Sequence, residues 1–168
     1  MTEAVTGFLN SLGIGHELSM FIISLIPFIE LRGGILWGHA LNIAPLEVFL
    51  ICVIANCIPI PFVILLARPI FAWLKRFKLF GKIIGKIETT IEKKADQVKA
   101  NKYEMLGLFL FVAIPLPGTG AYTGSLIAAL LKMRLKYAVP AIVVGVLVAG
   151  LIMTLASMGL FSFLGIVA

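Results

Sequence analysis

Four long apolar segments dominate the pattern of hydrophobic and polar positions along this chain: residues 18–46, 48–67, 105–131 and 137–157. Segments 48–67 and 137–157 contain 20 and 21 residues without a formal charge. That is the length of a helix that crosses a bilayer, roughly 20 apolar residues. The other two segments are longer, and each has a break near its middle. We therefore predict two full transmembrane helices and two broken segments.

The clearest break is the sequence IPLPGTGAYTG at residues 114–124. It lies inside segment 105–131, which contains no Asp, Glu, Lys or Arg and is therefore apolar enough to enter a bilayer. Its two prolines and three glycines make one straight helix unfavourable. In lipid, a broken helix persists only where protein or a water-lined cavity satisfies the freed backbone groups. Such breaks mark binding sites in transporters, so the pattern indicates an integral membrane protein with a transport site.

Composition agrees with a membrane protein. Hydrophobic residues make up 61% of the 168 residues, and charged residues 13%, against roughly 25% in soluble domains. The length predicts a single membrane domain, residues 1–168. No Lys or Arg precedes Arg32, so the basic start of a cleaved signal peptide is not expected. Cys52 and Cys57 lie in an apolar run, which favours buried hydrophobes over a disulfide or metal site.

Basic residues are distributed unevenly between the apolar segments. Ten of the 14 Lys and Arg residues lie in 68–104 and three in 132–136. Residues 1–17 carry two Glu and no basic residue, and residues 39–47 carry a single Glu. Because positive loops face the cytoplasm, residues 68–104 and 132–136 are predicted to be cytoplasmic and the N-terminus outside. The net charge of +6 is explained in this way, and no nucleic-acid partner is expected.

Segment 105–131 then has a basic, cytoplasmic loop at both ends and cannot cross the membrane. We predict a re-entrant hairpin, in which two half-helices enter the membrane and return to the same side. Helices of about 10–12 residues reach only part-way through a core of ~30 Å at 1.5 Å per residue. Segment 18–46 has two non-basic ends and a break at 27–34, which predicts a second hairpin entering from the opposite side. The competing interpretation is a plain bundle in which residues 18–41 cross once, with the N-terminus inside.

The predicted fold is therefore an all-α integral membrane fold with two inverted repeats. Each repeat is a re-entrant helical hairpin followed by a transmembrane helix, and a shift of 88 residues aligns the two spans. Within the basic linker, residues 77–102 follow the spacing of an amphipathic helix, predicted to lie at the cytoplasmic surface. Residues 1–17 are predicted as a shorter amphipathic segment, and residues 158–168 as a C-terminal tail.

Glu30 and Arg32, in the sequence PFIELRGG at 27–34, are the only formally charged residues inside an apolar segment. A charge at membrane depth costs at least ~2.5–3.5 kcal/mol on insertion scales, so such residues normally face a cavity and a partner. Side chains at i and i+2 do not pair on a regular helix, but at a turn both can point into one cavity. We interpret Glu30 and Arg32, with Gly33 and Gly34 at the same tip, as a substrate or proton site. The alternative is an ion pair that braces the hairpin.

The second hairpin contributes backbone and hydroxyl groups to the candidate site. Its glycines allow tight turns and close approach of a ligand, and Thr119 is positioned to cap the returning half-helix. A half-helix N-terminus favours a phosphate or carboxylate, and Arg32 is a fork-shaped donor for the same anion. Packing between hairpins is the alternative role of these small residues. The candidate residues of this tip are Pro115, Pro117, Gly118, Thr119, Gly120, Tyr122 and Thr123.

The first full span carries its own break at Asn56, Pro59 and Pro61. The prolines are predicted to kink the helix and free backbone carbonyls. Asn56 is polar at mid-membrane, and we interpret it as a polar contact across helices, with substrate contact as the alternative.

The motifs IELRGGI at 29–35 and IPLPGTGAYTGSLIA at 114–128 resemble those of the bacterial and archaeal family of small multi-drug export proteins. That family is distantly similar to the DedA or VTT (SNARE-associated) superfamily. The resemblance implies two opposed re-entrant hairpins, a multi-pass location in the cytoplasmic (inner) membrane, and an acidic residue in the first hairpin, which Glu30 matches. The arginines of the DedA pattern near the second hairpin do not carry over, because Val112 and Gly118 stand near their places. Either Arg32 substitutes for them or the substrate differs.

Three functions follow. The favoured one, implied by the DedA resemblance, is movement of an amphiphile with an anionic head, a polyprenyl phosphate or phospholipid, with protons as a coupling ion. The alternatives are a proton-coupled small multidrug exporter and a non-transporting membrane assembly protein. The sequence has no Ser/His/Asp or Cys/His set, metal-ligand spacing, Walker motif or GxGxxG loop, so neither an enzyme nor a cofactor is expected. Membrane lipids and a second copy of the chain in a homodimer are the expected partners.

Overall fold

The computed structural model describes residues 15–74, 76, 100–116 and 118–163, and these are helical with no strand. The helices are α2 His16–Leu25, α3 Glu30–Ala40, α4 Pro45–Cys57, α5 Pro59–Leu74, α7 Ala100–Ala113, α8 Ala121–Leu130 and α9 Leu135–Phe163. The amphipathic helix predicted at 77–102 and the N-terminal segment at 1–17 lie largely outside the described residues. The predicted C-terminal tail at 158–168 begins inside α9, which continues to Phe163.

Two helices are long and apolar enough to cross a membrane. They are the continuous run Pro45–Trp73, 29 residues, and Leu135–Gly159, 25 residues. Both are longer than the predicted spans 48–67 and 137–157. Only 39% and 44% of their most apolar windows are buried inside the protein, whereas the core helix of a soluble protein is mostly buried. Their outward side chains are apolar, as a lipid environment requires.

Prolines set the ends and breaks of several helices. α2 ends before Pro27, with Ile26 in an extended conformation, because a proline disfavours helical geometry in the residue before it. α4 ends at Cys57 and α5 begins at Pro59, so the predicted break in the first span is present. Pro45 occupies the first turn of α4, where its missing N–H leaves no helical hydrogen bond unmade.

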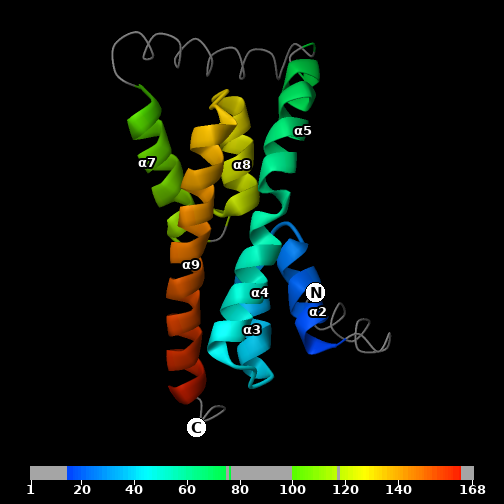
Figure 1. Ribbon diagram of the computed structural model, residues 1–168, viewed down its shortest axis with the longest axis vertical. Helices are drawn as coiled ribbons and strands as arrows, with labels where there is room; N and C mark the ends of the chain where they lie inside the picture. Colours follow the sequence, from blue (N-terminus) through cyan, green and yellow to red (C-terminus); the bar gives the residue numbers. More distant parts are fainter. Residues whose placement is uncertain (1–14, 75, 77–99, 117, 164–168) are drawn as a thin grey trace.

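The two broken segments each form a pair of short helices. Segment 18–46 gives α2 and α3, which pack against each other across the turn at residues 26–29, and segment 105–131 gives α7 and α8. The single helix considered for residues 18–41 is not formed, since the chain reverses at this turn. In Figure 1 the turn between α2 and α3 and the turn between α7 and α8 both lie near the middle of the long axis, one reached from each end.

The long helices hold the two pairs together. α9 contacts α7 and α8 in one half of the molecule and α3 and α4 in the other, while α8 also packs on α5. Arg68 of α5 donates a hydrogen bond to the carbonyl of Met133 in the α8–α9 turn, at 2.5 Å. The buried apolar core follows these contacts and includes Ile35, Val48 and Ile142.

Residues with positive φ recur in the backbone 90 residues apart. Positive φ angles occur at Phe28 and Gly118 (77° and 83°), at Glu30 and Gly120 (52° and 154°), and at Asn42 and Lys132 (56° and 53°). The turns after α3 and α8 also share hydrogen bonds: Asn42 N–H to His39 O at 3.0 Å, and Lys132 N–H to Ala129 O at 3.1 Å. The matching shift is thus 90 residues rather than the 88 aligned from the sequence.

Close helix contact in the first pair depends on a small residue. A Cβ at Gly38 of α3 would lie 2.5 Å from Met20 Sδ and 2.6 Å from Val48 Cγ2, and both of these side chains are fully buried. We expect Gly38→Ala to lower the free energy of unfolding by about 1–3 kcal/mol through overpacking. Unfolding of the purified protein in detergent, followed by circular dichroism, measures the change.

Gly107→Ala is the matched control, because a Cβ at Gly107 of α7 would meet nothing within 4 Å. Alanine is the better helix former, so this variant should be as stable as the parent or more so. Equal loss of stability in both variants would contradict the packing role of Gly38.

Candidate functional site

The two helix pairs meet where the turn before α3 touches the start of α8. Glu30 follows the α2–α3 turn and is the first residue of α3, whereas Gly120 follows the α7–α8 turn and is the N-cap of α8. A Cβ built on Gly120 would lie 1.9 Å from Glu30 Oε2. No side chain larger than hydrogen therefore fits at position 120 while the carboxylate is in place. In this structure the group that approaches Gly120 closely is the chain's own carboxylate, and the close approach of a ligand stays a prediction.

Glu30 caps the N-terminus of α8 from outside that helix. Its Oε1 accepts a hydrogen bond from the Tyr122 N–H at 3.3 Å, and the Ala121 N–H is a second donor to the same carboxylate. A helix N-terminus has unpaired N–H groups and a partial positive charge. The residue at the N-cap position, Gly120, has no side chain to satisfy them. The carboxylate therefore occupies the position that a capping side chain or a bound anion would take.

Arg32 completes the junction on the other side of the carboxylate. Its Nη1 donates to Glu30 Oε2 at 3.0 Å, and its Nη2 donates to Thr119 Oγ1 at 3.1 Å. Side chains at i and i+2 meet here because Glu30 has a positive φ of 52° and opens the helix, so the pair is not on regular helical geometry. Burial differs between the partners: the side chain of Glu30 is 4% exposed and that of Arg32 18%.

Thr119 does not cap α8, contrary to the sequence prediction. Its hydroxyl lies 2.7 Å from Ile114 O and 2.8 Å from Leu116 O, and it accepts from the Leu116 N–H at 3.2 Å. The hydroxyl has a single proton to donate, and it donates that proton to a backbone carbonyl of its own turn. The result is a tight turn that presents the Thr119 oxygen to Arg32.

Further contacts join the two tips. The Tyr122 hydroxyl donates to the backbone carbonyl of Leu25, at the end of α2. The sequence placed Tyr122 among the candidate residues of this tip but did not predict this hydrogen bond. Phe28 was not among the predicted site residues either. It lies in the turn before Glu30 with a φ of 77°, and its side chain is 98% exposed. An aromatic residue between Pro27 and Glu30 at a predicted break was the available signal.

The remaining predicted site residues lie in the helix pairs and turns around this junction. Gly33 and Gly34 pack inside the first pair, where a Cβ at Gly34 would lie 2.1 Å from Ser24 Oγ. Thr123 is half-buried in the first turn of α8, and Pro115 lies in the turn before it. Gly118 is exposed at a positive φ, and Pro117 lies outside the described residues.

Asn56 is fully buried, yet the expected bond across helices is not formed. Neither side-chain Oδ1 nor Nδ2 has a hydrogen-bond partner among the described residues. Asn56 is therefore a buried polar side chain of α4 without a hydrogen-bond partner in this part of the chain.

An apolar, largely helical chain with two membrane-length helices and a buried charge pair between paired short helices is a membrane protein. The comparisons with known proteins place it further. The family model described as "Putative small multi-drug export protein" matches residues 30–152, and the chain belongs to that family. Its name denotes an export protein, thus a transporter rather than an enzyme. Neither a curated protein nor a solved structure matches the chain.

The Glu30–Gly120 contact can be tested by a double-mutant cycle. Gly120→Ala should force the carboxylate off α8 and lower the free energy of unfolding by about 2–4 kcal/mol, since a buried charge loses its partners. In a Glu30→Ala background, the same change should cost only the backbone strain of an alanine at positive φ. The difference between the two backgrounds, measured by unfolding in detergent, is the coupling energy.

Gly118→Ala is a control for an alanine at positive φ that meets no other atom. Gly118 has a φ of 83° and a Cβ there would meet nothing within 4 Å, so about 1–2 kcal/mol is expected. An identical cost of Gly120→Ala in both backgrounds would show that the carboxylate does not rest on α8.

Proposed function

We propose that this protein is a DedA-like membrane transporter that moves an amphiphile with an anionic head group, a polyprenyl phosphate or a phospholipid, across the bilayer. The observation that carries the proposal is the carboxylate of Glu30 bound between the N-terminus of α8 and the guanidinium of Arg32. A site that holds a carboxylate with backbone N–H groups and an arginine fork has the chemistry to hold a phosphate.

In this proposal Glu30 is an internal occupant that the substrate's head group replaces. The space beside Gly120 holds one anion and no more. The Glu30 carboxylate already lies where a Cβ of residue 120 would be. Arg32 reaches the α7–α8 turn through Thr119 and remains beside an anion bound there. Arg32 thus takes the place of the arginines that the DedA pattern has near the second hairpin.

Replacement couples the anion to a proton. An ionised Glu30 that leaves Arg32 and the α8 N-terminus is a buried charge without partners, which is strongly unfavourable. A proton on the carboxylate removes that charge, so the anion enters as Glu30 is protonated. When the anion leaves, Glu30 releases its proton and returns to Arg32. Proton and anionic head group therefore bind together.

The inverted-repeat architecture is part of the same proposal, with α2–α3 and α7–α8 as re-entrant hairpins. α2 and α8 have 10 residues and α3 has 11, so each is about 15 Å long at 1.5 Å per residue, half of a ~30 Å core. The positive-φ pairs 90 residues apart support two copies of one unit, and Figure 1 supports their opposite direction. The basic α8–α9 turn is proposed to be cytoplasmic, the α3–α4 turn outside, and the membrane the inner membrane of a bacterium or archaeon.

The family name favours a second candidate, a proton-coupled exporter of small drugs. A cationic drug would bind the carboxylate of Glu30 in place of Arg32, and a proton would displace the drug. A third candidate is a membrane assembly protein that transports nothing, in which the Glu30–Arg32 pair only braces the tips. A homodimer is proposed for each candidate.

The re-entrant arrangement predicts the side from which each turn is labelled. With Cys52 and Cys57 first replaced by serine, single cysteines at His16, Asn42 and Lys132 are tested with a membrane-impermeant maleimide in intact cells. His16 and Asn42 should react from outside, and Lys132 only after the cells are opened. Labelling of His16 and Asn42 from opposite sides would show that α2 and α3 together cross the membrane.

The transport proposal predicts the effect of Glu30→Gln in proteoliposomes. Flipping of fluorescent polyprenyl phosphate and phospholipid is measured beside Glu47→Gln, a matched change of an exposed carboxylate in the first turn of α4. Glu30→Gln should fold, because its amide oxygen still accepts from the Tyr122 N–H, and should lose at least tenfold in flipping. Glu47→Gln should keep the parent rate.

Arg32→Gln separates the candidates. Loss of an arginine should abolish movement of an anionic head group, whereas a cationic drug bound by Glu30 should be moved as well or better. Folded parent protein that moves neither lipid nor drug would favour the assembly role.

A further inference from the structure

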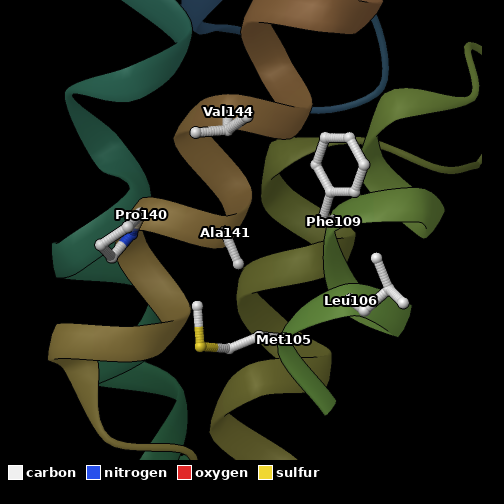
Figure 2. A pocket seen from close by; sticks show the side chains of 6 residues that line it. All are labelled: Met105, Leu106, Phe109, Pro140, Ala141 and Val144. Atoms are coloured by element: carbon white, nitrogen blue, oxygen red, sulfur yellow. The ribbon is translucent and has the colours of Figure 1, made fainter. Parts of the chain in front are cut away.

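A groove between α7 and α9 lies outside the junction. It has a volume of about 390 Å³ and is lined by Met105, Leu106, Phe109, Pro140, Ala141 and Val144. Three of these residues come from α7 and three from α9, and Figure 2 shows Met105 and Ala141 reaching toward each other between the two helices. All six are apolar, and Leu106 and Val144 are about half exposed, at 53% and 48%. The volume is within the roughly 300–1,000 Å³ of ligand-binding pockets.

The groove exists because the two helices separate toward their N-termini. They are in closest contact near Gly145, where a Cβ would lie 2.8 Å from Val112 Cβ and 3.1 Å from Phe109 O. From that point α7 moves away from α9 in the direction of the α8–α9 turn, as Figure 1 shows. Pro140 lies in the separated part and has no N–H to donate to the Lys136 carbonyl.

The end of the groove nearest the α8–α9 turn is basic. Lys132, Arg134 and Lys136 lie in the stretch 131–137, which contains no Asp or Glu. Tyr137 stands one helical turn before Pro140 and Ala141 and shares their face of α9. The Lys136 ammonium lies over the Tyr137 ring, 4.9 Å from its centroid, and Lys136 stands one helical turn before Pro140 of the groove lining.

One carboxylate, Glu104, lies at the same end on α7. It precedes Met105 by one residue, about 100° around the helix and away from the face that Met105, Leu106 and Phe109 share. Among the described residues, the groups that follow the groove along α9 at this end are therefore basic. An apolar groove with a positively charged end is complementary in polarity and charge to an amphiphile with a hydrocarbon tail and an anionic head.

We propose that this groove binds the hydrocarbon tail of an anionic phospholipid, with its head group against Lys136 at the basic end of α9. The inference deepens the proposed function and rests on it for the role of the site. The groove is the place where the amphiphile docks from the basic side of the membrane before its head group reaches Glu30 and Arg32. Binding itself does not require transport, so the two can be tested separately.

Photo-crosslinking in nanodiscs of the full chain tests the proposal. Phosphatidylglycerol and phosphatidylcholine carry the same diazirine-labelled acyl chain, and labelled peptides are mapped by mass spectrometry. We expect phosphatidylglycerol to label residues 105–109 and 140–144 about fivefold more than phosphatidylcholine does, from the attraction of a basic residue for an anionic surface. Lys136→Glu should abolish this difference.

Val144→Phe fills the groove from an exposed position and should remove the labelling. Leu151→Phe, also exposed on α9, is the matched control and should leave it unchanged. Equal labelling by the two lipids, or labelling spread along the whole apolar surface, would show annular lipid only and overturn the proposal. In a parallel sample with a photoreactive residue at Leu106, crosslinks to a second copy of the chain would overturn the proposal in favour of a dimer interface.

Flipping assays on the same preparations keep the two failures apart. Selective labelling without flipping retains the lipid site and rejects the proposed transport. Flipping without selective labelling retains transport and rejects the groove as its docking site.

Discussion

The carboxylate of Glu30 joins the two halves of this molecule, and its surroundings explain why the tips of the short helices meet. A buried carboxylate is unfavourable unless its oxygens are hydrogen-bonded and its charge is balanced. The N–H groups of α8 satisfy Oε1 and Arg32 balances Oε2. One of these partners belongs to the other helix pair, and Arg32 itself bonds to Thr119 of that pair. Either tip alone would leave charged or polar groups without partners, so the tips are stable together.

In the junction, one of two matching backbone positions has a charged side chain and the other has none. Glu30 and Gly120 are 90 residues apart and both have positive φ, so in the proposed repeat they are equivalent positions. They meet directly, with the carboxylate in the space of the missing Cβ. Two carboxylates would repel each other there, and two glycines would leave the α8 N-terminus uncapped. The unequal pair yields a single anion position that Arg32 borders.

In the proposed function, the site for the head group of the amphiphile and the groove for its tail are separated in space. The charged junction lies near the middle of the long axis, while the apolar groove lies between α7 and α9 toward the basic α8–α9 turn. In the proposed function these two regions bind different parts of an amphiphile, the junction its anionic head group and the groove its hydrocarbon tail.

The sequence by itself determined the membrane class, the two long helices and the breaks near Pro27 and Pro115, because apolar length and proline chemistry act locally. It also singled out Glu30 and Arg32, since charge inside an apolar segment requires a partner. It offered an ion pair between these two residues, which the structure contains, but it did not predict that Glu30 also accepts from an N–H of α8. Thr119 was expected to cap α8, but Glu30 does so, and Asn56 was expected to bond across helices, but does not. Only the tertiary structure decided these points, because they depend on which atoms two tips separated by 90 residues bring into contact, and no local pattern encodes that distance.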